Sequence, residues 1–130
     1  MELGKYIEEL KHDCIVDEIN LKESSLLLPA KKAKWVARLI LEKNNLNRLD
    51  KEKKELIQKI VDLLKEQAVV NLSAPVLRNK AEQHEKVLEI DVKMQTSKNL
   101  IDFFERIEKI MSSMSFDIGN IIKIVQLETT

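Results

Sequence analysis

The sequence contains little glycine, cysteine, proline or aromatic residue, and each shortage excludes a class of protein. Gly4 and Gly119 are the only glycines among 130 residues, so the chain lacks the glycine-rich loop with which P-loop and Rossmann proteins approach nucleotide phosphates. The single cysteine, Cys14, has no partner for a disulfide within the chain. The first residues also lack the apolar stretch of a secretory signal, and no apolar run approaches the roughly 20 residues of a spanning helix. We therefore expect an intracellular protein with no membrane association.

The abundant residues favour helices. Hydrophobic residues make up 44% of the chain and charged residues 34%, a balance too apolar for a disordered protein. Leu, Ile, Lys and Glu are frequent, and aromatic residues amount to 4%, which favours helix over sheet. We predict an all-α protein that forms a single domain over residues 1–130 or one subunit of a small oligomer.

A heptad pattern predicts one long helix. Apolar residues recur every seven positions, interrupted only by Glu42, at Leu21, Leu28, Trp35, Leu49, Leu56 and Leu63. A second column holds Leu39, Leu46 and Ile60, and two such columns are typical of a coiled-coil seam. Pro29 lies inside the pattern and removes a backbone donor, so we expect the helix to restart or kink there and to continue to about Gln67.

Shorter elements are expected before and after this helix. Helical spacing predicts an opening helix that ends near Asp13, with an apolar face of Leu3, Ile7, Leu10 and Cys14. Asp17 is a candidate cap for the long helix, and residues 68–75 are predicted to form a turn in which Ser73 caps the next helix.

The second half of the chain predicts three further helical segments. The first carries Leu77, Ala81, His84 and Leu88 on one face, and the stretch 90–95 that follows alternates in a way compatible with either a strand or a continued helix. The next has an apolar face of Leu100, Phe103, Phe104, Ile107, Ile110, Met111 and Met114. The cluster Ser112–Ser115 is expected to break it before a last short helix.

The chain offers no strong pattern for catalysis or metal binding. His12 and Cys14 lie two residues apart and His84 is remote from both, whereas zinc sites need three or four ligands at recognisable spacing. Cys14 is interpreted as a small core residue rather than a nucleophile. We expect neither a metal, a cofactor nor an enzymatic activity.

Basic charge is concentrated in the middle of a chain that has no net charge. Residues 29–67 hold 11 basic and 6 acidic residues, whereas residues 1–28 hold 3 and 7 and residues 68–130 hold 8 and 9. In the heptad frame one side of the long helix carries Lys31, Lys34, Arg38, Arg48 and Lys59. These residues either solubilise the helix or form a track for nucleic-acid phosphates, which lysine and arginine neutralise regardless of base sequence. Trp35 is expected in the seam, with base stacking as the alternative.

The C-terminal segment is unusually apolar. Residues 115–130 contain Phe116, Ile118, Ile121, Ile122 and Val125. This face either packs on the core of its own chain or docks on a neighbouring subunit, in which case the segment is an oligomerisation helix.

Short matches along nearly the whole chain resemble the UvsY family of recombination mediators from T-even-like phages. They are Glu8-Glu9-Leu10-Lys11, Asp13, Asp17, Lys34-Trp35, Arg48, Lys53-Lys54, Val87-Leu88, Leu100, Asp102-Phe103 and the pattern of residues 121–124. The resemblance implies a helical homo-oligomeric ring, a hexamer or similar, that binds single-stranded DNA. It also implies that the ring loads a RecA-like phage recombinase, in the host-cell cytoplasm, onto strands covered by the phage single-stranded-DNA-binding protein.

One departure from the family limits the transfer of its DNA-binding residues. The family's Lys-x-Arg pair on the long helix aligns with Gln58-Lys59-Ile60, so both charges are missing at their positions. The predicted DNA contacts are therefore the stripe and the aligned basic residues, namely Lys31, Lys34, Arg38, Arg48, Lys53, Lys54 and Lys59. A coiled-coil assembly or adaptor protein without nucleic-acid binding is the alternative that fits the heptads equally well.

Overall fold

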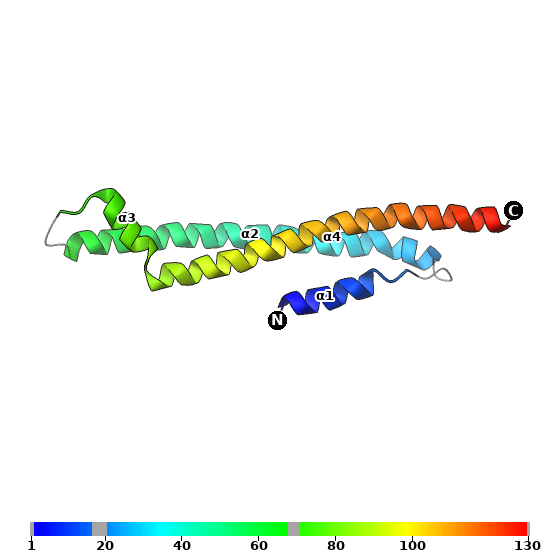
Figure 1. Ribbon diagram of the computed structural model, residues 1–130, viewed down its shortest axis with the longest axis horizontal. Helices are drawn as coiled ribbons and strands as arrows, with labels where there is room; N and C mark the ends of the chain where they lie inside the picture. Colours follow the sequence, from blue (N-terminus) through cyan, green and yellow to red (C-terminus); the bar gives the residue numbers. More distant parts are fainter. Residues whose placement is uncertain (1, 17–20, 68–70, 130) are drawn as a thin grey trace. The chain divides into compact units, whose positions relative to one another are not determined.

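The computed structural model describes residues 2–16, 21–67 and 71–129, and these residues are almost entirely helical. The helices are α1 (Glu2–Asp13), α2 (Leu21–Gln67), α3 (Ala74–Glu82) and α4 (Glu85–Thr129) (Figure 1). No strand occurs in this part of the chain. The predicted all-α class with one long heptad-patterned helix is confirmed, whereas assembly into a ring stays a prediction.

α2 is a single helix of 47 residues with Pro29 inside it. The predicted restart at Pro29 is therefore wrong. Proline removes one backbone hydrogen bond from a helix interior, but Leu21 and Leu28 on the N-terminal side of Pro29 are buried in the same core as Trp35 on its other side. Burial of apolar side chains on both sides keeps the helix continuous. Asp17, the predicted cap of this helix, lies outside the described residues.

The segment after α2 departs from the prediction in where its helices end. Ser73 occupies the N-cap position of α3 with extended backbone, but its side chain makes no capping hydrogen bond. α3 ends at Glu82, and the backbone N–H of Gln83 is shared between the carbonyls of Asn79 and Lys80. The face predicted from Leu77 to Leu88 is thus divided between two helices. Residues 68–70 of the predicted turn lie outside the described part.

α4 runs unbroken for 45 residues and resolves two open points. Residues 90–95 are helical, and the predicted break at Ser112–Ser115 is wrong. Serine costs a helix only about half a kilocalorie per mole relative to alanine, while Met111 and Ile118 on either side of the serines are both buried. Packing outweighs the local preference.

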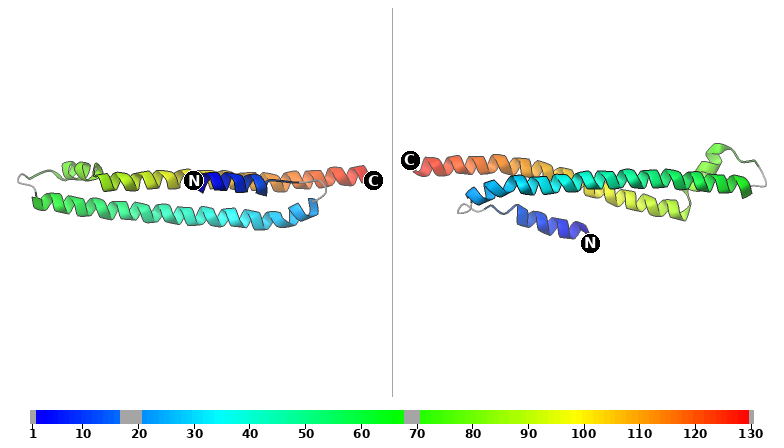
Figure 2. Two further views of the ribbon diagram at one scale, coloured as in Figure 1. Left: turned by 90° about the horizontal axis from the view of Figure 1, so that it is seen from below. Right: turned by 180° about the vertical axis from the view of Figure 1, so that it is seen from behind.

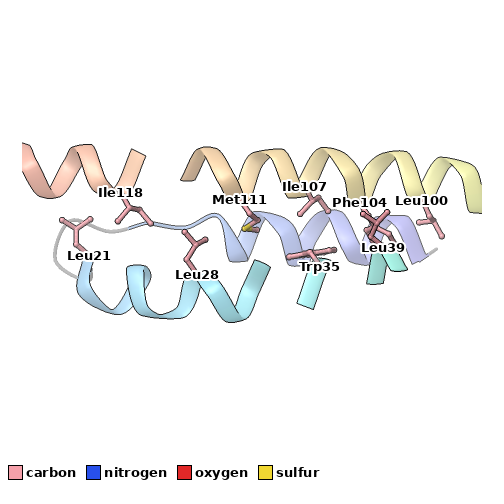
Figure 3. Close-up of a cluster of buried hydrophobic side chains, with 9 residues drawn as sticks. All are labelled: Leu21, Leu28, Trp35, Leu39, Leu100, Phe104, Ile107, Met111 and Ile118. Carbon is pink, nitrogen blue, oxygen red and sulfur yellow. The ribbon is translucent and has the colours of Figure 1, made fainter. Parts of the chain in front are cut away.

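The chain divides into two compact units, residues 1–41 with 100–130 and residues 42–99. In the first unit, the segment 21–41 of α2 lies beside the segment 100–129 of α4 (Figure 2). Figure 3 shows the buried side chains that the two segments share, namely Leu21, Leu28, Trp35, Leu39, Leu100, Phe104, Ile107, Met111 and Ile118. Apolar residues of α1 pack against this core, among them Leu3, Tyr6 and Leu10.

The second unit has a smaller core between α2, α3 and α4. Ile57, Ala81 and Val87 are buried there, and Leu56 and Ile60 pack against them. The predicted seam thus moves by one residue, because Ile57 is buried and Leu63 is exposed. A helix with 3.6 residues per turn drifts against a strict seven-residue repeat, which explains the shift.

Candidate functional site

A polar cluster joins α1 to α2 in the first unit. Asp13, the last residue of α1, is 5% exposed. Its carboxylate oxygen Oδ2 accepts a hydrogen bond from the indole Nε1 of Trp35 at 2.9 Å and one from Nζ of Lys34 at 2.6 Å. A buried carboxylate is stable only when it is paired and hydrogen-bonded, and here it receives both.

Glu9, one turn before Asp13, completes this cluster. Its carboxylate pairs with the Arg38 guanidinium through two bonds of 2.6 and 3.2 Å and accepts a third from Lys34 at 2.9 Å. The Arg38 guanidinium carbon also lies 4.7 Å from the ring centroid of Trp35 and 5.1 Å from that of Tyr6. We call Glu9, Asp13, Lys34 and Arg38 the polar cluster.

The polar cluster shifts the titration of two of its members. Hydrogen bonds from Arg38 and then from Lys34 hold the pKa of Glu9 below its ordinary value. Partial burial lowers the pKa of Lys34, but its hydrogen bonds to Asp13 and Glu9, together with their charges, raise the pKa above its ordinary value. Both shifts favour the charged forms, as expected of groups that hold two helices together.

The cluster accounts for three of the seven predicted DNA contacts. Lys34 and Arg38 are half-buried against the carboxylates of α1, and Nζ of Lys31 donates to the backbone carbonyl of Asp13 at 3.3 Å. Trp35 is 1% exposed, so it lies in the core as expected and offers no face for stacking a base. In the first unit α1 therefore covers the N-terminal part of the predicted stripe.

The remaining four predicted contacts belong to the second unit. Arg48 and Lys54 pair with acidic residues one turn away on α2, at 2.5 and 3.0 Å, and Lys53 pairs with Asp91 of α4 at 2.6 Å. Lys59 is exposed, and no acidic residue in the described part of the chain pairs with it. Exposed ion pairs contribute little energy, so phosphate can compete with them.

The structure gives a reason for the family departure at residues 58–60. Ile60 is half-buried and packs against the core of the second unit, where an arginine would be desolvated without a partner. Gln58 is exposed and donates to Asp62 at 2.9 Å. Lys59 alone of these three keeps a positive charge on the surface.

The predicted oligomerisation residues divide by the direction they face. Ile118 is buried, and Ile121, Ile122 and Val125 are half-buried against the core of their own unit. Phe116 is 71% exposed. Within this one chain, four of the five residues contribute to the fold of the first unit.

Sequence reasoning did not connect the carboxylates of α1 with the basic residues of α2. Glu9 and Asp13 are spaced one turn apart, and the residues that carry the family resemblance include both of them together with Lys34-Trp35. That coincidence was the available signal.

No catalytic or metal-binding arrangement was found among the described residues. Burial, followed by the charge of Asp13, raises the pKa of the Cys14 thiol, which disfavours the nucleophilic thiolate. No three potential metal ligands gather in residues 2–16, 21–67 and 71–129. In the same ranges no helix is both long and apolar enough to cross a membrane.

Comparison with known proteins identifies the family. Residues 9–130 match the family described as "Recombination, repair and ssDNA binding protein UvsY". The chain belongs to the UvsY family. No curated protein sequence matches it.

Solved structures of a UvsY protein share the fold. A crystal structure of the bacteriophage T4 recombination mediator protein UvsY, lattice type IV, superposes with a TM-score of 0.85 at 23% identity, covering 98% of this chain and 99% of that one. Lattice types II and I give TM-scores of 0.82 and 0.77, both at 21% identity. They cover 100% and 93% of this chain and 99% and 96% of the other.

Proposed function

We propose that the protein is a non-enzymatic recombination mediator that binds single-stranded DNA. The observation that carries the proposal is the match to the UvsY family, described by recombination, repair and single-stranded DNA binding, over residues 9–130. In this role it promotes the loading of a RecA-like phage recombinase onto strands covered by the phage single-stranded-DNA-binding protein, in the host-cell cytoplasm. Its effect is stoichiometric, because it bridges DNA and recombinase rather than turning over a substrate.

The DNA contacts are proposed on α2, and Lys59 has the strongest claim among them. It is exposed and free of acidic partners in the described residues, and it neighbours the family's basic pair in the alignment. Arg48, Lys53 and Lys54 follow, since their surface ion pairs exchange readily for phosphate contacts. Lys31, Lys34 and Arg38 stay in the proposal but contact DNA only where phosphate displaces the carboxylates of α1.

Repetition of these weak contacts is proposed to come from a homo-oligomer, a hexamer or similar ring. A neutral subunit with few free cations binds DNA weakly, whereas linked copies raise the effective concentration of each site. In this proposal residues 1–130 act as one mediator domain, and residues 115–130 join the subunits. Ending the chain after Met114 is a poor test, because it removes the buried Ile118 and so damages the fold of the first unit.

The proposal is tested by binding of a fluorescent single-stranded oligonucleotide, measured by anisotropy at several salt concentrations. Each phosphate contact contributes about 0.7 to the slope of log affinity against log salt for single strands. Lys59→Glu should weaken binding and flatten that slope by about 0.7 for each subunit that contacts the strand. The matched control is Lys98→Glu, another exposed lysine outside α2, which should leave the slope unchanged.

Two results would contradict the proposal. If the full-length protein binds no single-stranded DNA at low salt, it is better described as a coiled-coil assembly or adaptor protein. If Lys59→Glu and Lys98→Glu behave alike while the wild type binds, the DNA site lies away from Lys59.

A further inference from the structure

The C-terminal turns of α4 present large apolar side chains away from their own core. Phe116 is 71% exposed, and Ile124 and Leu127 are also exposed. Phe116 and Leu127 are separated by 11 residues, which is close to three helical turns, and therefore lie on the same side. We call Phe116, Ile124 and Leu127 the α4 outer face.

α2 carries an apolar strip on the side opposite the core of the first unit. It begins at Leu26, which is 70% exposed, and ends at Leu41. Between them the exposed residues Ala30, Ala33 and Ala37 follow at intervals of three or four, the spacing of one helix face. We call these five residues the α2 strip, and none of them is charged.

The two surfaces match in size and in length. The alanines of the α2 strip leave shallow holes that let another helix approach closely, whereas the α4 outer face supplies bulky knobs. Ala30 and Leu41 are 11 residues apart, as are Phe116 and Leu127, so both surfaces span about 16 Å at 1.5 Å per residue. Neither surface packs against the core of its own unit.

Their charges are also complementary. Residues 21–41 of α2 hold five basic residues and one acidic residue, a net charge of +4. Residues 116–129 of α4 hold one basic and two acidic residues, a net charge of −1. Helices of opposite sign attract, whereas two copies of the α2 segment facing one another would repel.

We propose that the α2 strip of one protomer binds the α4 outer face of a second copy of this chain. The contact joins two different surfaces, so every protomer offers one of each, and repetition closes a ring or extends a filament. The inference rests on the oligomer proposed above and names the surfaces that build it. It also gives α4 two roles, with one side in the core of its own unit and the other on a neighbour.

Charge insertion tests each surface at matched exposure. Leu26→Glu and Phe116→Glu should each lower the molar mass found by light scattering toward the 15.1 kDa of one chain, with helical circular dichroism retained. The control is Val92→Glu in the second unit, where the native side chain is 67% exposed, and it should keep the mass of the wild type. If both variants keep the assembled mass, the interface is refuted while the oligomer stands. If the wild type is itself a monomer at micromolar concentration, both proposals fail.

Cross-linking between two differently labelled proteins tests the pairing directly. In a Cys14→Ser background, one protein carries Ala30→Cys or Ala37→Cys and the other carries Phe116→Cys or Leu127→Cys. Mild oxidation of the mixture should give α2-to-α4 dimers, and the pairs that react define the relative direction of the helices. Each protein alone should stay uncross-linked. Dimers of a single variant, or none in any mixture, would overturn the proposal.

Discussion

Removing the carboxylate of Asp13 is expected to weaken the attachment of α1 more than its position near the chain terminus suggests. The change Asp13→Ala takes away the acceptor for the Trp35 indole and one of the two partners of the Lys34 ammonium. Because Trp35 is buried, its N–H has no water to replace the lost acceptor.

The size of the effect follows from these two contacts. A buried donor left without a partner costs about 1–3 kcal/mol, and a hydrogen bond to a charged group contributes about 1.5–3 kcal/mol. The Lys34 side chain is 34% exposed and keeps its bond to Glu9, so its share is small. We expect Asp13→Ala to lower the free energy of unfolding by about 2–4 kcal/mol, and Asp13→Asn by about 1–2 kcal/mol because the amide oxygen still accepts from the indole.

The assay is urea unfolding followed by the fluorescence of Trp35, the only tryptophan in the chain. The control is Asp102→Ala, which breaks an exposed pair with Arg106 in the same unit and should cost less than about 1 kcal/mol. If Asp13→Ala costs no more than Asp102→Ala, Asp13 does not anchor α1 and the reasoning is wrong.

Three further outcomes are expected. The tryptophan signal should depend on pH at both extremes: Glu9, with its pKa below the ordinary 4.5, stabilises the fold above about pH 4.5 and loses this effect as pH falls through the lowered pKa, whereas Lys34, with its pKa above the ordinary 10.5, stabilises it below about pH 10.5 and loses this effect as pH rises through the raised pKa. A flat signal from pH 2 to 12 would contradict these shifts. Ser97→Ala removes a buried hydroxyl that donates to a glutamate of α2 at 2.7 Å and should cost about 1–2 kcal/mol by chemical denaturation; no change would mean that water replaces the bond. Ile118→Ala should cost about 2–4 kcal/mol and Ile124→Ala less than about 0.5 kcal/mol, and equal costs would place both side chains in the same environment.

Much of the fold could be predicted from the sequence because helix formation depends on neighbours within one or two turns. The heptad columns of α2 and the end of α1 at Asp13 both follow from local spacing. The errors came where local signals conflicted with packing. Pro29 and the serines at 112–115 interrupt a helix in isolation, but buried residues on both sides of each hold α2 and α4 together.

The family was also accessible from the sequence, since short matches in a constant order survive at low overall identity. They pointed to the UvsY family, which the match over residues 9–130 then established. The same residues did not reveal that Glu9 and Asp13 hold Lys34 and Arg38.

Only the tertiary structure decided which basic and apolar residues are available to a partner. Periodicity places Lys34, Arg38 and Lys59 outside the seam alike, but it carries no information about what a distant segment places over them. Glu9 lies 29 residues before Arg38, and no spacing rule links residues so far apart. An ion pair of this kind forms only because packing of α1 on the core brings the two charges together, and the same packing leaves Lys59 exposed on the second unit.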